Sequence, residues 1–88
     1  MKTFDKDPAA VLEYGWPWAV WLNGDTIDVF SFDVPTGLTE VISYEEDGLI
    51  TLWLSGGTLG KSYRVTCTIT TAAGRIEQRS AIFNMVDK

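Results

Sequence analysis

The sequence predicts an all-β protein in which about seven short antiparallel strands stack as the two layers of a sandwich. Short runs of alternating apolar and polar residues predict the strands, and turn-forming Gly, Pro and Asn residues separate them at intervals of roughly 8 to 12 residues. No stretch predicts a helix longer than one turn. Of the 88 residues, 45% are hydrophobic, which is enough for one packed core. We therefore expect a flexible lead-in over residues 1–9 and one sandwich domain over residues 10–88.

The first part of the chain contains two predicted strands joined by one helical turn. Residues 11–18 alternate large apolar side chains, and Pro17 makes this an edge strand because proline cannot donate a hydrogen bond to a sheet. Residues 19–22 follow as a single helical turn. Residues 26–34 are rich in strand-forming types, but the parity of their apolar residues changes, so we expect a β-bulge near Val29.

The middle of the chain adds strands over residues 38–44 and 49–54, which the acidic turn Glu45-Glu46-Asp47-Gly48 separates. In the second of these strands, one face carries Ile50, Leu52 and Leu54, and the other carries Leu49, Thr51 and Trp53. Both faces are expected to be partly covered. Residues 55–60 contain too many glycines for a helix or a strand and are predicted to be a connection.

The clearest half-buried strand lies in the last third of the chain. Residues 63–70 alternate apolar side chains, starting with Tyr63, with arginine or threonine. Ala72-Ala73-Gly74 predicts a tight hairpin loop, and residues 75–86 return as the antiparallel neighbour. Cys67 has the inward parity of its strand, so we expect it to be a buried core residue with a raised pKa.

Charge and hydropathy argue against two classes of partner. The net charge is −5 and the seven basic residues are dispersed, whereas proteins that bind nucleic acid cluster such residues to neutralise phosphates. No membrane association is expected, because the longest apolar stretch, around Val20, is far shorter than the ~20 residues of a spanning helix. The start of the chain lacks the apolar run of an export signal, and the single cysteine favours folding in a reducing compartment.

The sequence predicts no catalytic, cofactor-binding or metal-binding residue. It contains no histidine, which excludes nucleophilic catalysis that depends on imidazole. The turns Asn23-Gly24-Asp25 and Glu45-Glu46-Asp47 lack the regular oxygen spacing of a calcium loop and are interpreted as solvated turns. The segment that ends in Gly60-Lys61-Ser62 has Ser55 where a phosphate loop requires its first glycine, and a strand follows it instead of a helix.

Tryptophan side chains are the main candidates for a partner surface. The large rings of Tyr14, Trp16, Trp18 and Trp21 lie close together in the sequence. Strand parity sends Trp16 and Trp18 to one face, which favours burial in the core, and a hot spot for a partner is the alternative. Trp53 has the opposite parity to its apolar neighbours and is a second candidate for exposure. The candidate partner-binding residues are therefore Trp16, Trp18, Trp21 and Trp53.

The segment Gly60-Lys61-Ser62-Tyr63-Arg64-Val65 resembles the Gly-x-x-Tyr-x-Val pattern that opens the penultimate strand of fibronectin type III and bacterial Ig-like domains. In those domains the tyrosine hydroxyl bonds to nearby backbone, an arrangement known as the tyrosine corner. This resemblance implies an immunoglobulin-like β-sandwich.

A second resemblance extends from about residue 6 to residue 83. Its motifs are Lys6-Asp7-Pro8, Val11-Leu12-Glu13-Tyr14, Trp18, Trp21-Leu22, Gly24-Asp25-Thr26-Ile27, Val34-Pro35-x-Gly37-Leu38, Trp53-Leu54-Ser55-Gly56-Gly57-Thr58, Thr70-Thr71-x-x-Gly74-Arg75 and Arg79-Ser80. In this order they resemble small structural proteins of tailed phages and prophages, described as fibre-tail adaptors or Ig-like virion proteins. The resemblance implies a place in the virion, assembly in the bacterial host cytoplasm, and tail or fibre proteins as partners. Association of several copies of the chain is left open.

The leading hypothesis is a non-catalytic protein–protein adaptor in tail or fibre assembly, and not an enzyme. Its mechanism would be surface complementarity, in which an edge strand adds to a partner sheet and tryptophans act as anchors. The alternative is a carbohydrate- or cell-surface-binding Ig-like module, in which the same rings stack on a glycan.

Overall fold

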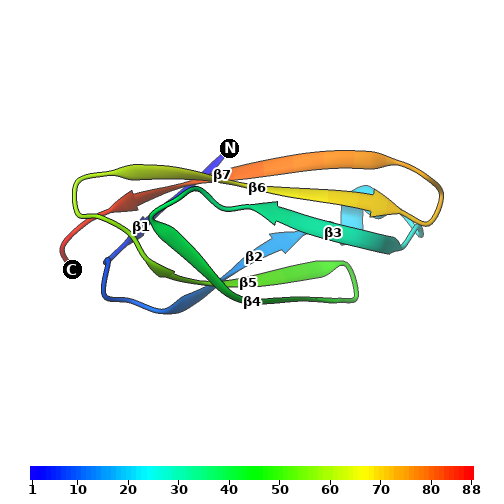
Figure 1. Ribbon diagram of the computed structural model, residues 1–88. Helices are drawn as coiled ribbons and strands as arrows, with labels where there is room; N and C mark the ends of the chain where they lie inside the picture. Colours follow the sequence, from blue (N-terminus) through cyan, green and yellow to red (C-terminus); the bar gives the residue numbers. More distant parts are fainter.

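Two β-sheets lie face to face in the computed structural model, which describes all 88 residues (Figure 1). The four-stranded sheet has the order β1-β7-β6-β3, and the three-stranded sheet has the order β2-β5-β4. The elements are β1 (Lys2–Lys6), β2 (Leu12–Pro17), α1 (Ala19–Leu22), β3 (Ile27–Asp33), β4 (Leu38–Glu46), β5 (Leu49–Gly56), β6 (Ser62–Thr71) and β7 (Ile76–Met85). The predicted all-β sandwich, the edge position of β2 and the single helical turn are confirmed. No helix has the length and apolar character needed to cross a membrane.

The core lies between the two central strands. Ile50, Leu52 and Leu54 of β5 point inward and are fully buried, as are Val65, Cys67 and Ile69 of β6. This alternation confirms the predicted inward face of the strand that begins at Tyr63. The register of β3 against β6 shifts between Ile27 and Val29, which confirms the predicted bulge. A second shift, which was not predicted, lies between Glu40 and Ile42 in β4.

Residues 1–9 differ from the predicted flexible lead-in. β1 pairs in parallel with the second half of β7, from Lys2 opposite Ala81 to Lys6 opposite Met85, so one pair of the sandwich is not antiparallel. The physical reason is Phe4, whose ring stacks on Phe83 at a centroid distance of 5.2 Å. Burial of this ring offsets the entropy lost when the segment is ordered.

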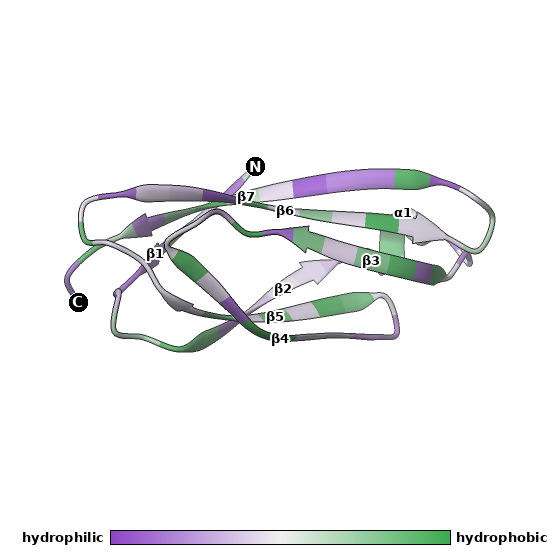
Figure 2. Cartoon of the chain, viewed as in Figure 1, coloured by the Kyte–Doolittle hydropathy of each residue, from purple (hydrophilic) through white to green (hydrophobic).

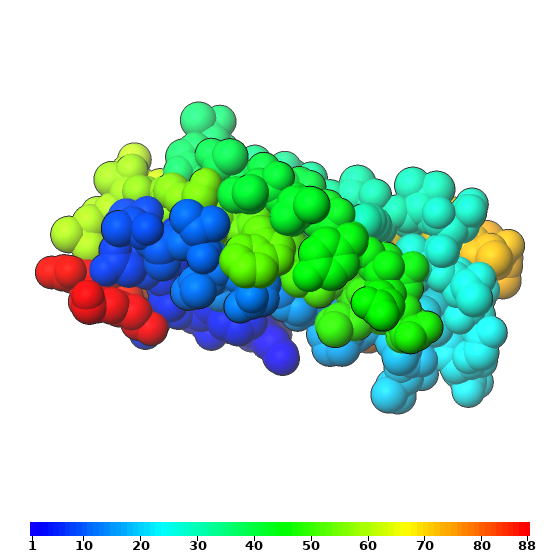
Figure 3. All heavy atoms as spheres, turned by 90° about the horizontal axis from the view of Figure 1, so that it is seen from below, coloured from blue at the N-terminus to red at the C-terminus, as the bar shows by residue number.

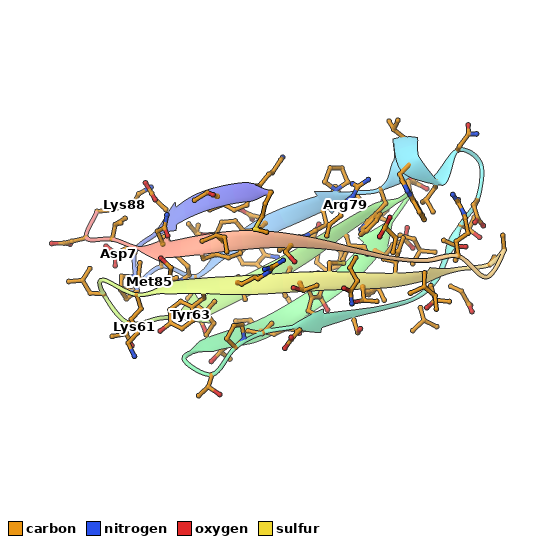
Figure 4. The ribbon with its side chains drawn as sticks, turned by 90° about the horizontal axis from the view of Figure 1, so that it is seen from above. Asp7, Lys61, Tyr63, Arg79, Met85 and Lys88 are labelled. Atoms are coloured by element: carbon orange, nitrogen blue, oxygen red, sulfur yellow. The ribbon has the colours of Figure 1, made fainter.

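Lys6 links the two sheets. Its side chain is fully buried, and its Nζ donates hydrogen bonds to the carbonyl oxygens of Gly56 at 2.7 Å and Asp7 at 3.1 Å. Burial lowers the pKa of Lys6, and the nearby charge of Asp7 offsets only part of this effect. The Asp7 carboxylate accepts hydrogen bonds from the backbone N–H groups of Ala9 and Lys88, at 2.9 and 3.1 Å, so it holds the C-terminal end beside β1 (Figure 4).

The tyrosine corner predicted from the sequence is present. The backbone N–H of Thr58 donates a hydrogen bond to the Tyr63 hydroxyl at 3.1 Å. The ring also lies against Gly37, where an added Cβ would come within 2.8 Å of the hydroxyl oxygen and where φ is +109°. Glycine is therefore needed at this turn for both its conformation and its size. The corner joins β6 to the connection before it and to the turn before β4.

Replacement of Trp18 by alanine is expected to lower the free energy of unfolding by about 3 to 5 kcal/mol, because it removes a fully buried ring from the core. Chemical denaturation followed by circular dichroism measures this loss. Val20→Ala is the control, since Val20 is 96% exposed and its truncation is expected to cost less than about 0.5 kcal/mol. Equal effects of the two substitutions would show that Trp18 is not part of the core.

Candidate functional site

Two of the four candidate tryptophans lie in the core. Trp16 is 4% exposed and meets Phe32 edge-on at a centroid distance of 5.0 Å. Trp18 is fully buried, and the guanidinium carbon of Arg79 lies 4.1 Å from the centre of one of its rings. Arg79 also donates a hydrogen bond to the carbonyl oxygen of Pro17. Neither indole has a free face, so the core interpretation of both rings agrees with the structure.

Trp21 is half-buried and covered by a cation. The guanidinium carbon of Arg75 lies 4.2 Å from the ring centre. Arg75 also pairs with Asp25 at 3.1 Å and donates a hydrogen bond to the Leu22 carbonyl oxygen at 2.9 Å. The Thr71 side chain, followed by the N–H groups of Thr26 and Arg75, lowers the pKa of the Asp25 carboxyl group. Arg75 therefore fixes α1 against the β6–β7 hairpin and leaves little of the Trp21 ring for a partner.

Trp53 has a different environment, on the outer side of the three-stranded sheet. It is half-buried and lies opposite Ile42 of β4. Ile42, Tyr44 and Leu49 share this side of the sheet and are 56%, 45% and 44% exposed. We refer to Ile42, Tyr44, Leu49 and Trp53 as the apolar face. Figure 3 views the molecule from this side, with the side chains of β4 and β5 across the middle of the surface, and Figure 2 shows hydrophobic segments in both strands.

Glycine in β2 makes room for the apolar face. Gly15 lies on the outer side of β2, opposite Thr51. A Cβ added at Gly15 would lie 3.2 Å from Cδ1 of Leu49, so the leucine side chain extends over the glycine. The edge of the face is acidic, because Glu13 pairs with Trp53 and Glu46 pairs with Leu49. The result is an apolar centre between two acidic side chains.

The outer side of the four-stranded sheet is polar along β6, and the exposed side chains of Val29 and Ile76 flank Thr70 at one end of it. Along β6 it carries Arg64, Thr66, Thr68 and Thr70. Hydrogen bonds connect these side chains to β7, with Thr66 bonded to Ser80 at 2.8 Å and Gln78 donating to Thr68 at 3.1 Å. The hydroxyl groups are therefore partly engaged with one another. The outer side of β6 is thus polar, whereas the outer side of β5 carries Leu49, Thr51 and Trp53.

Cys67 behaves as the sequence predicted. It is a free, buried cysteine, and burial raises the pKa of its thiol to about 11. The Trp18 indole N–H and the charge of Arg79 lower the pKa but offset only part of this effect. The indole nitrogen makes no hydrogen bond of normal geometry, so its contribution is weak. No three Asp, Glu, Cys or His side chains gather in an arrangement that would hold a metal ion.

The comparison with known families decides where the chain belongs. A protein-family model described as podophage GP4 fiber-tail adaptor protein gp77 matches residues 6–84. The chain belongs to this family. The match runs from the end of β1 to the penultimate residue of β7, so the gp77 family spans nearly the whole sandwich. A search of curated proteins found no match.

The gp77 family is one of fibre-tail adaptors, which supports a structural adaptor role in a phage tail. A structural adaptor of this kind belongs to the virion and has virion proteins as partners. Sequence reasoning found Trp53 by its parity but missed Ile42 and Tyr44 as its neighbours. The alternation of apolar residues in β4 did not reveal them, because the unpredicted bulge changes which residues of that strand point outward.

Stability is expected to fall by about 2 kcal/mol between pH 9 and pH 11 because of Cys67. Its pKa is raised from the ordinary value of 9.0 to about 11, so the unfolded chain releases the thiol proton at a lower pH than the folded chain. Urea denaturation of the unmodified protein and of Cys67→Ala at each pH measures this effect. The difference between their free energies of unfolding separates the contribution of the thiol from that of the tyrosines, which titrate in the same range in both proteins. A difference that is constant across this range would mean that the thiol is not buried.

Proposed function

We propose that this gp77-family protein is a non-catalytic adaptor that docks onto another virion protein through its apolar face. The observation that carries the proposal is the contrast between the two outer sides of the sandwich. On one side, β4 and β5 present four adjoining apolar side chains, two of them aromatic. On the other side, β6 presents arginine and threonine, and the exposed apolar residues Val29 and Ile76 are separated by Thr70. Contiguous exposed apolar surface of this kind marks protein interaction sites.

The layout of the apolar face supports a protein partner. Protein interfaces combine an apolar, aromatic centre with a polar rim. Trp53 lies on the central strand of its sheet, between Ile42 on one side and Glu13 on the other. Residues that dominate binding energy are enriched in tryptophan and tyrosine and cluster near the centre of an interface. Trp53 therefore has the position and chemistry of an anchor, with Tyr44 on the neighbouring strand.

A glycan partner fits this face less well. Sugar rings stack on exposed aromatic rings, but their hydroxyl groups also need hydrogen-bond partners close by. Ile42, directly opposite Trp53 on β4, offers none, and the polar side chains nearest to the ring are Glu13 of β2 and Thr51 of β5. The apolar side chains on the β4 side of Trp53 support protein docking over the carbohydrate-binding alternative.

Trp53→Ala is expected to weaken binding to the tail or fibre partner by about 30-fold or more, the loss typical of a hot spot of about 2 kcal/mol. Co-purification of the tagged chain with the tail and fibre proteins of its phage measures the effect. The free energy of unfolding should change much less than for Trp18→Ala, since Trp53 is only half-buried.

A matched pair of surface substitutions tests which side of the sandwich docks. Ile42 and Val29 are 56% and 58% exposed, but Val29 lies on the outer side of the four-stranded sheet, opposite Thr70. Ile42→Ser should reduce co-purification, and Val29→Ser should leave it unchanged. The proposal would be overturned if both substitutions reduced co-purification equally. It would also be overturned if the purified protein bound a glycan array and Trp53→Ala abolished that binding.

A further inference from the structure

The first half of β7 has an unpaired edge. β1 pairs only with Ala81–Met85, whereas Ile76–Ser80 pair with β6 alone. In Figure 4, β1 ends before it reaches the part of β7 that carries Arg79. The position beside Ile76–Ser80 in the four-stranded sheet is therefore empty along about 17 Å, at ~3.4 Å per residue. We refer to residues 76–80 as the open edge.

Every second backbone N–H of the open edge points away from β6. Val86 N–H donates to the Lys6 carbonyl oxygen on the β1 side, and Met85 N–H donates to Lys61 on the β6 side. Since N–H direction alternates along a strand, Gln78 N–H also points to the β1 side, into the empty position. There it donates to the Glu77 side chain at 3.0 Å. The Glu77 carboxylate thus accepts the hydrogen bond that the Gln78 N–H would otherwise donate to a neighbouring strand.

A groove of about 610 Å³ lies beside the open edge, with walls from β1, β2 and β7 and from Arg64 of β6. Its lining contains three basic side chains, Lys2, Arg64 and Arg79, and no acidic one. This is unusual in a chain with a net charge of −5 and only seven basic residues. Arg79 has no carboxylate partner, because the single salt bridge of the structure joins Arg75 and Asp25. Phe4 and Pro17 add apolar lining, and Trp16 contributes only the small exposed part of its ring.

We propose that the open edge binds an extended, acidic segment of a partner protein, which adds as a strand to Ile76–Ser80 in line with β1. Backbone hydrogen bonds to the edge supply affinity, and side chains of the added strand supply specificity. Alternate carboxylates of the segment reach Lys2 and Arg79, which share the inner side of the sheet edge, while Arg64 adds positive charge from the outer side. The Glu77 side chain gives up the Gln78 N–H. Charge complementarity with the groove selects an acidic occupant over a neutral or basic one.

This site gives the adaptor a second surface. The open edge belongs to the four-stranded sheet, whereas the apolar face belongs to the three-stranded sheet. Two partners are thereby held at once, as a protein that joins two components requires. The inference rests on the proposed function only for the statement that the acidic segment comes from a virion protein.

The test uses two blocked eight-residue peptides, one in which Asp alternates with Val and one in which Lys replaces Asp. The acidic peptide is expected to slow amide hydrogen exchange at Gln78 and Ser80 of the full chain and to bind at least tenfold more tightly than the basic peptide. Equal affinity of the two peptides, or protection along β2, β3 or β4 instead, would overturn the proposal. Absence of binding by the acidic peptide at millimolar concentration would also overturn it.

Gln78→Pro removes the N–H that faces the empty position and keeps the β6–β7 hydrogen bonds, because this N–H does not point to β6. Binding of the acidic peptide is expected to fall at least tenfold.

The double substitution Lys2→Glu with Arg64→Glu should reverse the preference between the two peptides. Lys61→Glu with Lys88→Glu is the control, because it changes the net charge by the same amount outside the groove. The reversal tests the site even if the proline variant does not fold. Ile42→Ser should leave peptide binding unchanged, which separates failure of this site from failure of the apolar face.

Discussion

The alternation of buried side chains in β5 and β6 is the constraint on which the rest of the structure depends. Ile50 and Leu52 of β5 face Val65 and Cys67 of β6 across the core, and all four are fully buried. Because successive side chains of a strand point to opposite faces, burial of one set forces the other set outward. Trp53 is thus directed to the surface by the burial of its neighbours. The same rule directs the threonines of β6 to the opposite surface, so the core determines the chemistry of both outer sides.

Lys6 sets the position of β1 and, through it, the extent of the open edge. A buried ammonium group is costly unless hydrogen bonds replace its water, and here the carbonyl oxygens of Gly56 and Asp7 do so. These bonds attach the end of β1 to the other sheet. Phe4 packs on Phe83 and fixes the register of β1 on the second half of β7. The first half of β7 is consequently left without a neighbour on that side.

Strand period and local turn chemistry predicted much of the fold, including the inward face of β6 and the bulge near Val29, and the resemblance to Ig-like domains implied the tyrosine corner at Tyr63. These features depend on residues close together in the sequence. β1 was not predicted, because Phe4 is its only apolar residue and parallel pairing with β7 depends on contacts between opposite ends of the chain. Trp18 lies just beyond the end of β2, where strand parity no longer describes the direction of a side chain. Its burial, which the sequence predicted, depends on packing against Trp21 of α1 and Arg79.

Charge gives the two proposed surfaces different requirements. Glu13 and Glu46 flank the apolar face, so a partner with basic groups at its rim fits there and an acidic one is repelled. Lys2, Arg64 and Arg79 line the groove at the open edge, where the preference is the opposite. Electrostatic complementarity of this kind suppresses wrong pairings more than it adds affinity. A partner suited to one of the two proposed surfaces is therefore disfavoured at the other.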